Sequence, residues 1–206
     1  MSLFGGGERA RMRWFEEKQH LMEAALGPIQ EGCVQMIIGP GPHGPNATYF
    51  FQQHNDGTGL ATMELAPLKG KHASNSVYRK YEFVTFTQQK VGQNVGDLSD
   101  MAGDTPGGRL RAALAFIGAY AFEARLEPGN TLEFPEEFGE SVAGRAFVFD
   151  TYMPEKFSRS FGLMLMMEIH REEMAWAMDN NGQALIEKLK ASGIYPFSRT
   201  DRPTVV

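Results

Sequence analysis

The segment Gly162–Ile169 constrains the fold more than any other part of the chain. It is apolar at both alternating sets of positions, with Glu168 as the single exception. A strand that faces water on one side alternates apolar and polar residues, so a strand that is apolar throughout needs cover on both faces. The segment therefore predicts a strand at the centre of a sheet, with its three methionines in the core and helices packed on both sides.

Three helices are predicted to supply this cover. Residues 8–27 carry apolar residues on one helical face and charged residues on the other, and Gly27-Pro28 ends the helix. A second helix covers residues 110–124, where apolar residues on nearly all sides indicate deep burial. A third helix covers residues 171–190, and Asn180-Asn181-Gly182 marks a point where it could bend or break.

Short runs with β-branched or aromatic residues predict six further strands. Because the strand signals mix irregularly with the helices, they favour an α+β fold over regular βαβ winding. We expect a mixed, largely antiparallel β-sheet flanked by about three helices, in one domain over residues 1–206, with the helix at 8–27 as an N-terminal extension. The predicted strands are residues 33–38, 48–53, 59–65, 81–89, 131–134 and 146–151.

Composition excludes several classes of function. A formal net charge of −5 and a pI near 5.6 argue against nucleic acid as the main ligand, since binding its backbone needs clustered Lys and Arg. No run approaches the ~20 apolar residues of a membrane helix, and the N-terminus lacks the pattern of a signal peptide. The single cysteine, Cys33, is expected to be a buried thiol. These features predict a cytoplasmic protein with no membrane partner.

His170 with Glu172 and Glu173 is the only constellation that suggests catalysis, because an imidazole beside two carboxylates can bind a metal or move protons. No second histidine lies at i+4, as a zinc-protease helix requires. The carboxylates are better explained by the first turn of a helix, where unpaired amides and the helix dipole favour negative charge. We expect no metal and no cofactor. The alternative is a metal-assisted hydrolase that adds the loop residues His43, His54 and His72.

Several stretches together resemble the bacterial suppressor-of-fused domain family. Near the C-terminus these are EIHREEMAWA at residues 168–177, GIYP at 193–196 and DRPTVV at 201–206. Upstream, YEFVTF at residues 81–86 and LEPGNTL at 126–132 are also similar. The resemblance runs from Tyr81 to the C-terminus.

The resemblance implies a function that needs no catalytic residue. The eukaryotic namesake of the family is a non-enzymatic repressor that clamps a short segment of a transcription factor as an added strand. Its bacterial relatives are proposed to be immunity proteins that bind and neutralise toxins. The resemblance thus implies a non-enzymatic protein-binding module whose partner is another protein or an extended peptide. A small-metabolite partner is left open by the residues.

Contact residues and structural residues are both expected in these stretches. An exposed sheet edge beside the loop at residues 92–108 could accept an added strand. Glu168 and Arg202 could pair, and Tyr195-Pro196 could turn the chain back onto the sheet. The candidate partner-contact residues are Asp97, Asp100, Tyr152, Asp201 and Arg202.

Overall fold

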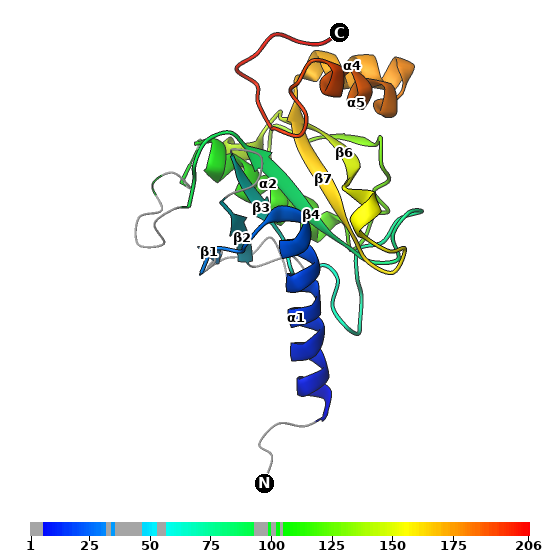
Figure 1. Cartoon of the computed structure of the whole chain (residues 1–206). Helices are drawn as coiled ribbons and strands as arrows, with labels where there is room; N and C mark the ends of the chain where they lie inside the picture. The colour runs from blue at the N-terminus through cyan, green and yellow to red at the C-terminus, as the bar shows by residue number, and fades with distance from the viewer. Residues whose placement is uncertain are drawn as a thin grey trace.

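A single mixed sheet organises the protein (Figure 1). The computed structural model describes residues 6–31, 34–35, 47–52, 57–92, 99, 102–103 and 105–206. Its strand order is β1-β2-β3-β4-β7-β6-β5, and all neighbouring pairs are antiparallel except β4 and β7. The strands are β1 (Val34–Gln35), β2 (Ala47–Phe51), β3 (Thr58–Ala61), β4 (Tyr81–Thr87), β5 (Thr131–Glu133), β6 (Ala146–Tyr152) and β7 (Gly162–Ile169).

The predicted central strand is confirmed. All eight residues of β7 are buried, and so are all seven residues of β4 beside it. The two strands run parallel in a register that pairs Tyr81 with Gly162 and Val84 with Leu165. Because β7 contributes core residues to both faces, each face of the sheet has its own hydrophobic cluster.

The helices divide between the two faces of the sheet. Leu110, Leu114 and Ile117 of α2 pack with Met164 and Met166 of β7 on one face. The opposite face carries α1, α4 and α5, together with the C-terminal tail. The α+β prediction is therefore confirmed, with five α-helices among the described residues in place of about three. The helices are α1 (Gly6–Leu26), α2 (Pro106–Tyr120), α3 (Gly139–Val142), α4 (Arg171–Asn180) and α5 (Gly182–Ala191), with a 3-10 turn, η2 (Pro154–Lys156).

The third predicted helix breaks where its sequence is weakest. Asn181 has a φ of 129°, which ends α4, and its side chain accepts hydrogen bonds from the amides of Gln183 and Ala184 to begin α5. Gly182 packs so closely against Gly129 that a Cβ would lie 1.8 Å from the carbonyl oxygen of Gly129. The break is thus held by a cap and by a contact that only glycine permits.

The second predicted helix is less enclosed than its sequence suggests. It ends at Tyr120, which is 50% exposed, so the expected burial of all its sides is wrong at this position. The reason is geometric: the sheet covers one face of α2, and Tyr120 lies at the helix end.

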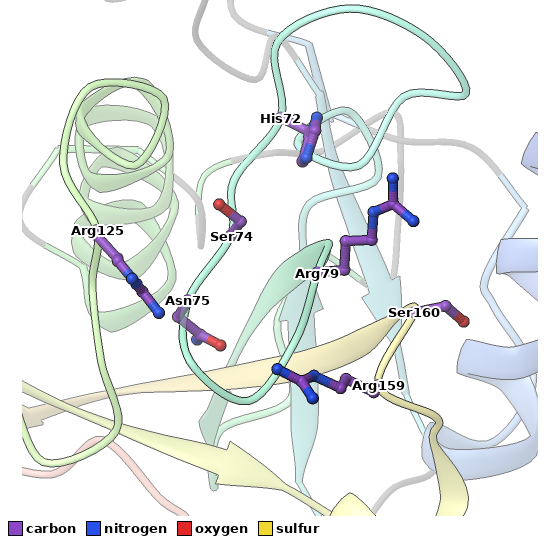
Figure 2. Close-up of a pocket in the computed structure, with 7 residues that line it drawn as sticks. All are labelled: His72, Ser74, Asn75, Arg79, Arg125, Arg159 and Ser160. Carbon is purple, nitrogen blue, oxygen red and sulfur yellow. The ribbon is translucent and has the colours of Figure 1, made fainter.

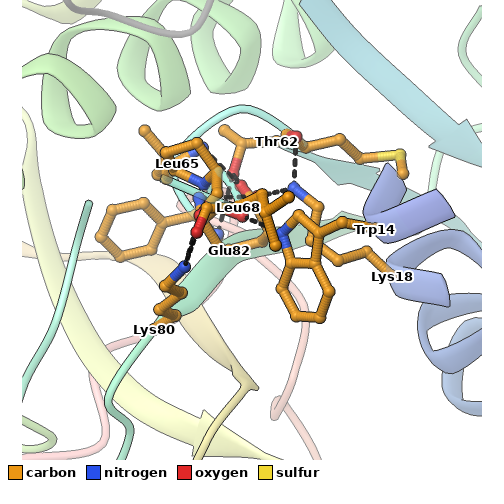
Figure 3. A network of polar contacts seen from close by, with 11 residues as sticks. Trp14, Lys18, Thr62, Leu65, Leu68, Lys80 and Glu82 are labelled. Atoms are coloured by element: carbon orange, nitrogen blue, oxygen red, sulfur yellow. Dashed lines mark hydrogen bonds and ion pairs between the residues drawn. The ribbon is translucent and has the colours of Figure 1, made fainter. Parts of the chain in front are cut away.

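A buried ion pair joins α1 to the centre of the sheet (Figure 3). The ammonium of Lys18 donates to the Glu82 carboxylate at 2.7 Å and to the carbonyl of Met63 at 2.6 Å, and both side chains are at most 2% exposed. The first turns of α1 project away from the body, whereas Met22 and Leu26 enter the core (Figure 1). The later half of α1 is therefore part of the domain core.

The Glu82 carboxylate accepts hydrogen bonds from two segments, α1 and the stretch that follows β3. Besides Lys18 it accepts the hydroxyl of Thr62 at 2.8 Å and the amides of Leu65 and Ala66 at 3.0 Å each. Since these two amides turn towards Glu82, β3 ends at Ala61 and not at residue 65 as the sequence predicts. The carboxylate thus shapes the chain that leaves β3.

Some predictions fall outside the described residues. These are Cys33, most of the first strand at residues 33–38 and most of the loop at 92–108. Within the described residues, no helix combines the length and apolar character that crossing a bilayer requires.

We expect Lys18→Met to lower the free energy of unfolding by about 3–5 kcal/mol, because it leaves Glu82 as a buried charge without its counterion. Urea denaturation followed by far-ultraviolet circular dichroism measures this change. Lys69→Met removes the same charge at an exposed position and should stay within about 0.5 kcal/mol of the parent. Equal denaturation midpoints for the two variants would contradict the structural importance of the pair.

Candidate functional site

A cleft opens where the end of β6 meets η2, α5 and the chain that follows α5. Its volume is about 430 Å³, within the range of ligand-binding pockets. We call it the Asp150 cleft, lined by Asp150, Tyr152, Glu155, Lys190 and Tyr195 among others. It lies on the sheet face that carries α1, α4 and α5, since Tyr152 belongs to the hydrophobic cluster of that face.

The pattern of β6 places Asp150 on a face that is otherwise apolar. Ala146, Val148 and Tyr152 share its side of the strand and are all buried. Asp150 itself is only 5% exposed. A buried carboxylate needs donors, and here they come from three elements: the amide of Thr151 at 2.8 Å, the hydroxyl of Tyr195 at 3.2 Å and the ammonium of Lys190 at 3.4 Å.

Burial dominates the electrostatics of Asp150. It raises the pKa of this carboxyl above the usual value, although Lys190, the Thr151 amide and Tyr195 each act to lower it. Burial, followed by the charge of Asp150, also raises the pKa of Tyr195. A titratable group that is destabilised in its charged form and lies in a cleft is a candidate for function.

Lys190 links the floor of the cleft to its rim. Its ammonium lies 5.0 Å from the centroid of the Tyr195 ring and 3.1 Å from the Glu187 carboxylate. It is 38% exposed, so it bridges the buried Asp150 and the solvent. The cleft thus presents carboxylates, an ammonium and aromatic rings together.

The rim of the cleft includes a strained residue. Met153 has φ 45° and ψ 53°, the left-handed region that residues with a side chain rarely adopt. Such a conformation costs about 1–3 kcal/mol and is found preferentially at binding and active sites. Because Met153 joins β6 to η2, this strain is located at one wall of the cleft.

The C-terminal tail holds the Tyr195 wall in place. After Pro196 the chain returns to the sheet, where Phe197 bridges Phe86 in parallel and the Ser198 amide donates to the carbonyl of Phe86 at 2.8 Å. The Ser198 hydroxyl also accepts the amide of Glu168 at 3.0 Å. The predicted turn of the tail onto the sheet is therefore confirmed.

A second buried ion pair anchors the end of the tail. Arg202 donates from both terminal nitrogens to the Glu173 carboxylate, at 2.5 and 2.7 Å. Burial alone would raise the pKa of Glu173, but hydrogen bonds from Arg202 and from the amides of His170 and Val205 outweigh burial and lower it. The carboxylate therefore stays charged and holds the tail against α4.

The predicted pair between Glu168 and Arg202 is wrong. Glu168 binds Arg145 at 2.9 Å, and Arg202 binds Glu173. Arg145 directly precedes β6, whose Phe147 lies opposite Glu168 in the sheet, so Arg145 is the nearer cation. Glu173 in the first turn of α4 is the carboxylate that the returning tail meets.

The candidate contact residues do not form one group. Tyr152 lines the Asp150 cleft but is only 4% exposed. Asp201 is exposed and pairs with Arg199 at 3.1 Å, whereas Arg202 is buried in the pair with Glu173. Asp97 and Asp100 lie outside the described residues.

The histidines of the rival metal site are not brought together. The Nε2 of His170 lies 2.9 Å from the carbonyl oxygen of Arg202 and therefore donates to it. His72 precedes the start of β4, and His170 follows the end of the parallel strand β7, so they lie at opposite ends of the sheet. His43 and His54 are outside the described residues, and no cluster of three potential metal ligands occurs among the residues described.

Sequence reasoning missed Asp150, Lys190 and Tyr195 as a group. One signal was available: Asp150 is a lone carboxylate at a core-facing position of a predicted strand. Lys190 and Tyr195 gave no such signal, because their approach to Asp150 depends on how α5 packs on β6.

Comparison with known proteins identifies the fold. No family model matches the chain, and no match was found among curated proteins. A putative suppressor-of-fused homolog from Neisseria gonorrhoeae matches with a TM-score of 0.64 at 12% identity, covering 95% of this chain and 98% of that one. A chain from the Sufu-Fu complex matches with a TM-score of 0.60 at 11% identity, covering 95% of this chain and 91% of that one.

A third solved structure, Drosophila Suppressor of Fused, matches with a TM-score of 0.57 at 11% identity. The match covers 95% of this chain, which spans about half (51%) of the Drosophila chain. This chain therefore has the suppressor-of-fused fold, and the predicted resemblance is confirmed at the level of fold.

We expect Asp150→Asn to raise the free energy of unfolding at pH 7. The pKa of Asp150 is raised in the folded protein above 3.8, its value in the unfolded chain. The stability that protonation of Asp150 contributes is therefore fully present below pH 3.8 and is lost as the pH rises through the folded-state pKa. The advantage of the variant should therefore shrink as pH falls towards 4. Urea denaturation at several pH values measures it.

Asp201→Asn is the matched control for this prediction. Hydrogen bonding to Arg199 lowers the pKa of Asp201, so its titration acts with the opposite sign. A gain in stability for Asp201→Asn at pH 7, or none for Asp150→Asn, would show that burial of Asp150 is not the governing factor.

Proposed function

We propose that this protein is a non-enzymatic protein-binding module that holds an extended segment of a partner protein in the Asp150 cleft. The observation that carries the proposal is the fold match over 95% of the chain, which includes a chain from a Sufu-Fu complex. The Neisseria homolog extends the same fold to a bacterial protein.

The chemistry of the cleft supports a peptide with a basic side chain. Asp150 and Glu155 both line the cleft, and a third carboxylate, Glu187, forms an ion pair with Lys190 of the cleft at 3.1 Å. A basic side chain would supply the buried Asp150 carboxylate with a further donor and so offset the burial that raises its pKa. The net charge of −5 favours the approach of a basic partner as well.

The residues of the rival hydrolase have structural tasks that support the binding function instead. His170 donates to the tail, and Glu173 accepts from Arg202 and from the Val205 amide. Breaking either set of bonds to bind a metal would release the tail that positions Tyr195.

The role that fits best among bacterial suppressor-of-fused domains is immunity, in which the protein binds and neutralises a toxin in the cytoplasm. The resemblance of residues 168–177 and 201–206 to that group supports this role.

A library of extended peptides displayed on phage tests the binding site. We expect the protein to enrich peptides that contain Lys or Arg, and we expect the double variant Asp150→Asn with Glu155→Gln to lose this enrichment. Sequencing of the retained phage measures the outcome. The double variant Glu16→Gln with Glu17→Gln makes the same charge change on the exposed face of α1 and should retain it. Identical enrichment by both double variants would place the binding site elsewhere.

Co-expression tests the immunity role separately. Cells that produce a toxic protein encoded beside the gene should grow when this protein is also made, and the two should co-purify. We expect Asp150→Asn with Glu155→Gln to restore growth less well than the Glu16 and Glu17 control. Growth arrest despite abundant folded protein would reject immunity while leaving peptide binding to the library experiment.

A further inference from the structure

A second cavity, separate from the Asp150 cleft, is lined by three arginines (Figure 2). We call it the arginine pocket, lined by Arg79, Arg125, Arg159, His72 and Asn75 among others, with a volume of about 550 Å³. The arginines come from three different connections: Arg79 from β3–β4, Arg125 from α2–β5 and Arg159 from β6–β7. Figure 2 shows Arg125 and Arg159 reaching in from different connections, with Asn75 between them.

Two of these arginines lack an acidic partner within the described part of the chain. The guanidinium groups of Arg79 and Arg159 make no ion pair and no side-chain hydrogen bond there, although acidic residues outnumber basic ones by 25 to 20 in the whole sequence. Both residues are exposed, so their guanidinium groups are accessible to an incoming anion.

Backbone hydrogen bonds hold the two arginines beside each other. The Arg79 amide donates to the carbonyl of Arg159 at 2.8 Å, and the Gly162 amide donates to the carbonyl of Lys80 at 3.1 Å. These bonds continue the parallel pairing of β4 and β7 beyond the strand ends. The two side chains therefore start from neighbouring backbone positions at one pocket, and an anion between their guanidinium groups would be attracted by both.

Arg125 adds a third charge that is partly neutralised. It pairs with Glu127 at 2.6 Å, and Glu127 also accepts the Ser76 amide at 3.0 Å. Because Ser76 already supplies donors to Glu127, the carboxylate does not depend on Arg125 alone. The remaining donors of the Arg125 guanidinium are available to a ligand, since a guanidinium carries five N–H groups.

The arrangement matches a tetrahedral oxyanion better than a planar one. A carboxylate offers two oxygens in one plane, whereas a phosphoryl group offers three terminal oxygens that donors can approach from several sides. Arginine is the side chain that binds phosphoryl groups in bidentate geometry. The volume exceeds that of a phosphate ion, so there is room for the group that carries it.

From these observations we infer that the arginine pocket is a binding site for a phosphoryl group, with Arg79 and Arg159 as its principal ligands and Arg125 as the third. The group could belong to a phosphorylated side chain of another protein or to a small phosphorylated molecule. Its chemistry is the same in both cases. The site does not depend on peptide binding in the Asp150 cleft.

Isothermal titration calorimetry of the full chain with phenyl phosphate tests the inference, with benzoate as the carboxylate probe at equal ionic strength. We expect phenyl phosphate to bind and benzoate to bind at least about tenfold more weakly. The double variant Arg79→Ser with Arg159→Ser should lose at least about tenfold in affinity for phenyl phosphate, because it removes the charge-assisted hydrogen bonds.

The matched control is Arg9→Ser with Arg13→Ser, which removes the same charge from the projecting part of α1 and should bind as the parent does. Circular dichroism establishes that each variant is folded. Equal affinity of the two double variants, or equal binding of benzoate, would overturn the assignment.

A phosphoserine peptide library and the same library after phosphatase treatment then distinguish the two sources. Phosphate-dependent retention of peptides by the parent, and not by Arg79→Ser with Arg159→Ser, would assign the site to a phosphorylated protein. Binding of phenyl phosphate with no peptide retention would assign it to a small phosphorylated molecule. Both results require the same arginines and so support the phosphoryl site.

Discussion

The buried pair of Lys18 and Glu82 is the interaction on which the rest of the structure depends. Glu82 sits in a strand whose other positions are all buried, so its carboxylate is stable only while Lys18, Thr62 and two backbone amides surround it. The same bonds seat α1 on the sheet and shape the chain after β3. That chain continues to Arg79, so the pair also supports one wall of the arginine pocket.

The two cavities share a wall, the connection between β6 and β7. Its first residues, from Met153 to Glu155, line the Asp150 cleft, and Arg159 and Ser160 line the arginine pocket. α1 holds this connection through Lys156, which donates to the carbonyl of Ala24 at 2.9 Å, and through the ring contact of Trp14 with Phe161. A single helix thus stabilises two sites of opposite charge.

Tyr78, the residue before Arg79, is buried in the core. A Cβ on Gly162 would lie 2.2 Å from the ring of Tyr78, so glycine is required where this ring packs. Burial, followed by the charges of Asp150 and Glu155, raises the pKa of Tyr78 to about 12. Its neighbour Arg79 lines the basic pocket. Of these two adjacent residues, Tyr78 is affected by the charges of the Asp150 cleft, and Arg79 lines the arginine pocket.

The sequence by itself determined the local structure and the fold class. The apolar run of β7 predicted a covered central strand, the periodicity of residues 8–27 predicted a helix, and Asn180-Asn181-Gly182 marked a point where the third helix could bend or break, because each signal lies in the pattern of neighbouring residues. Tertiary structure alone decided the pairings. Arg202 meets Glu173 and not Glu168, and Lys190 and Tyr195 meet Asp150, because charged partners are selected by distance in the folded chain. Both sites consist of such pairings, which join strands, helices and connections that sequence spacing does not relate.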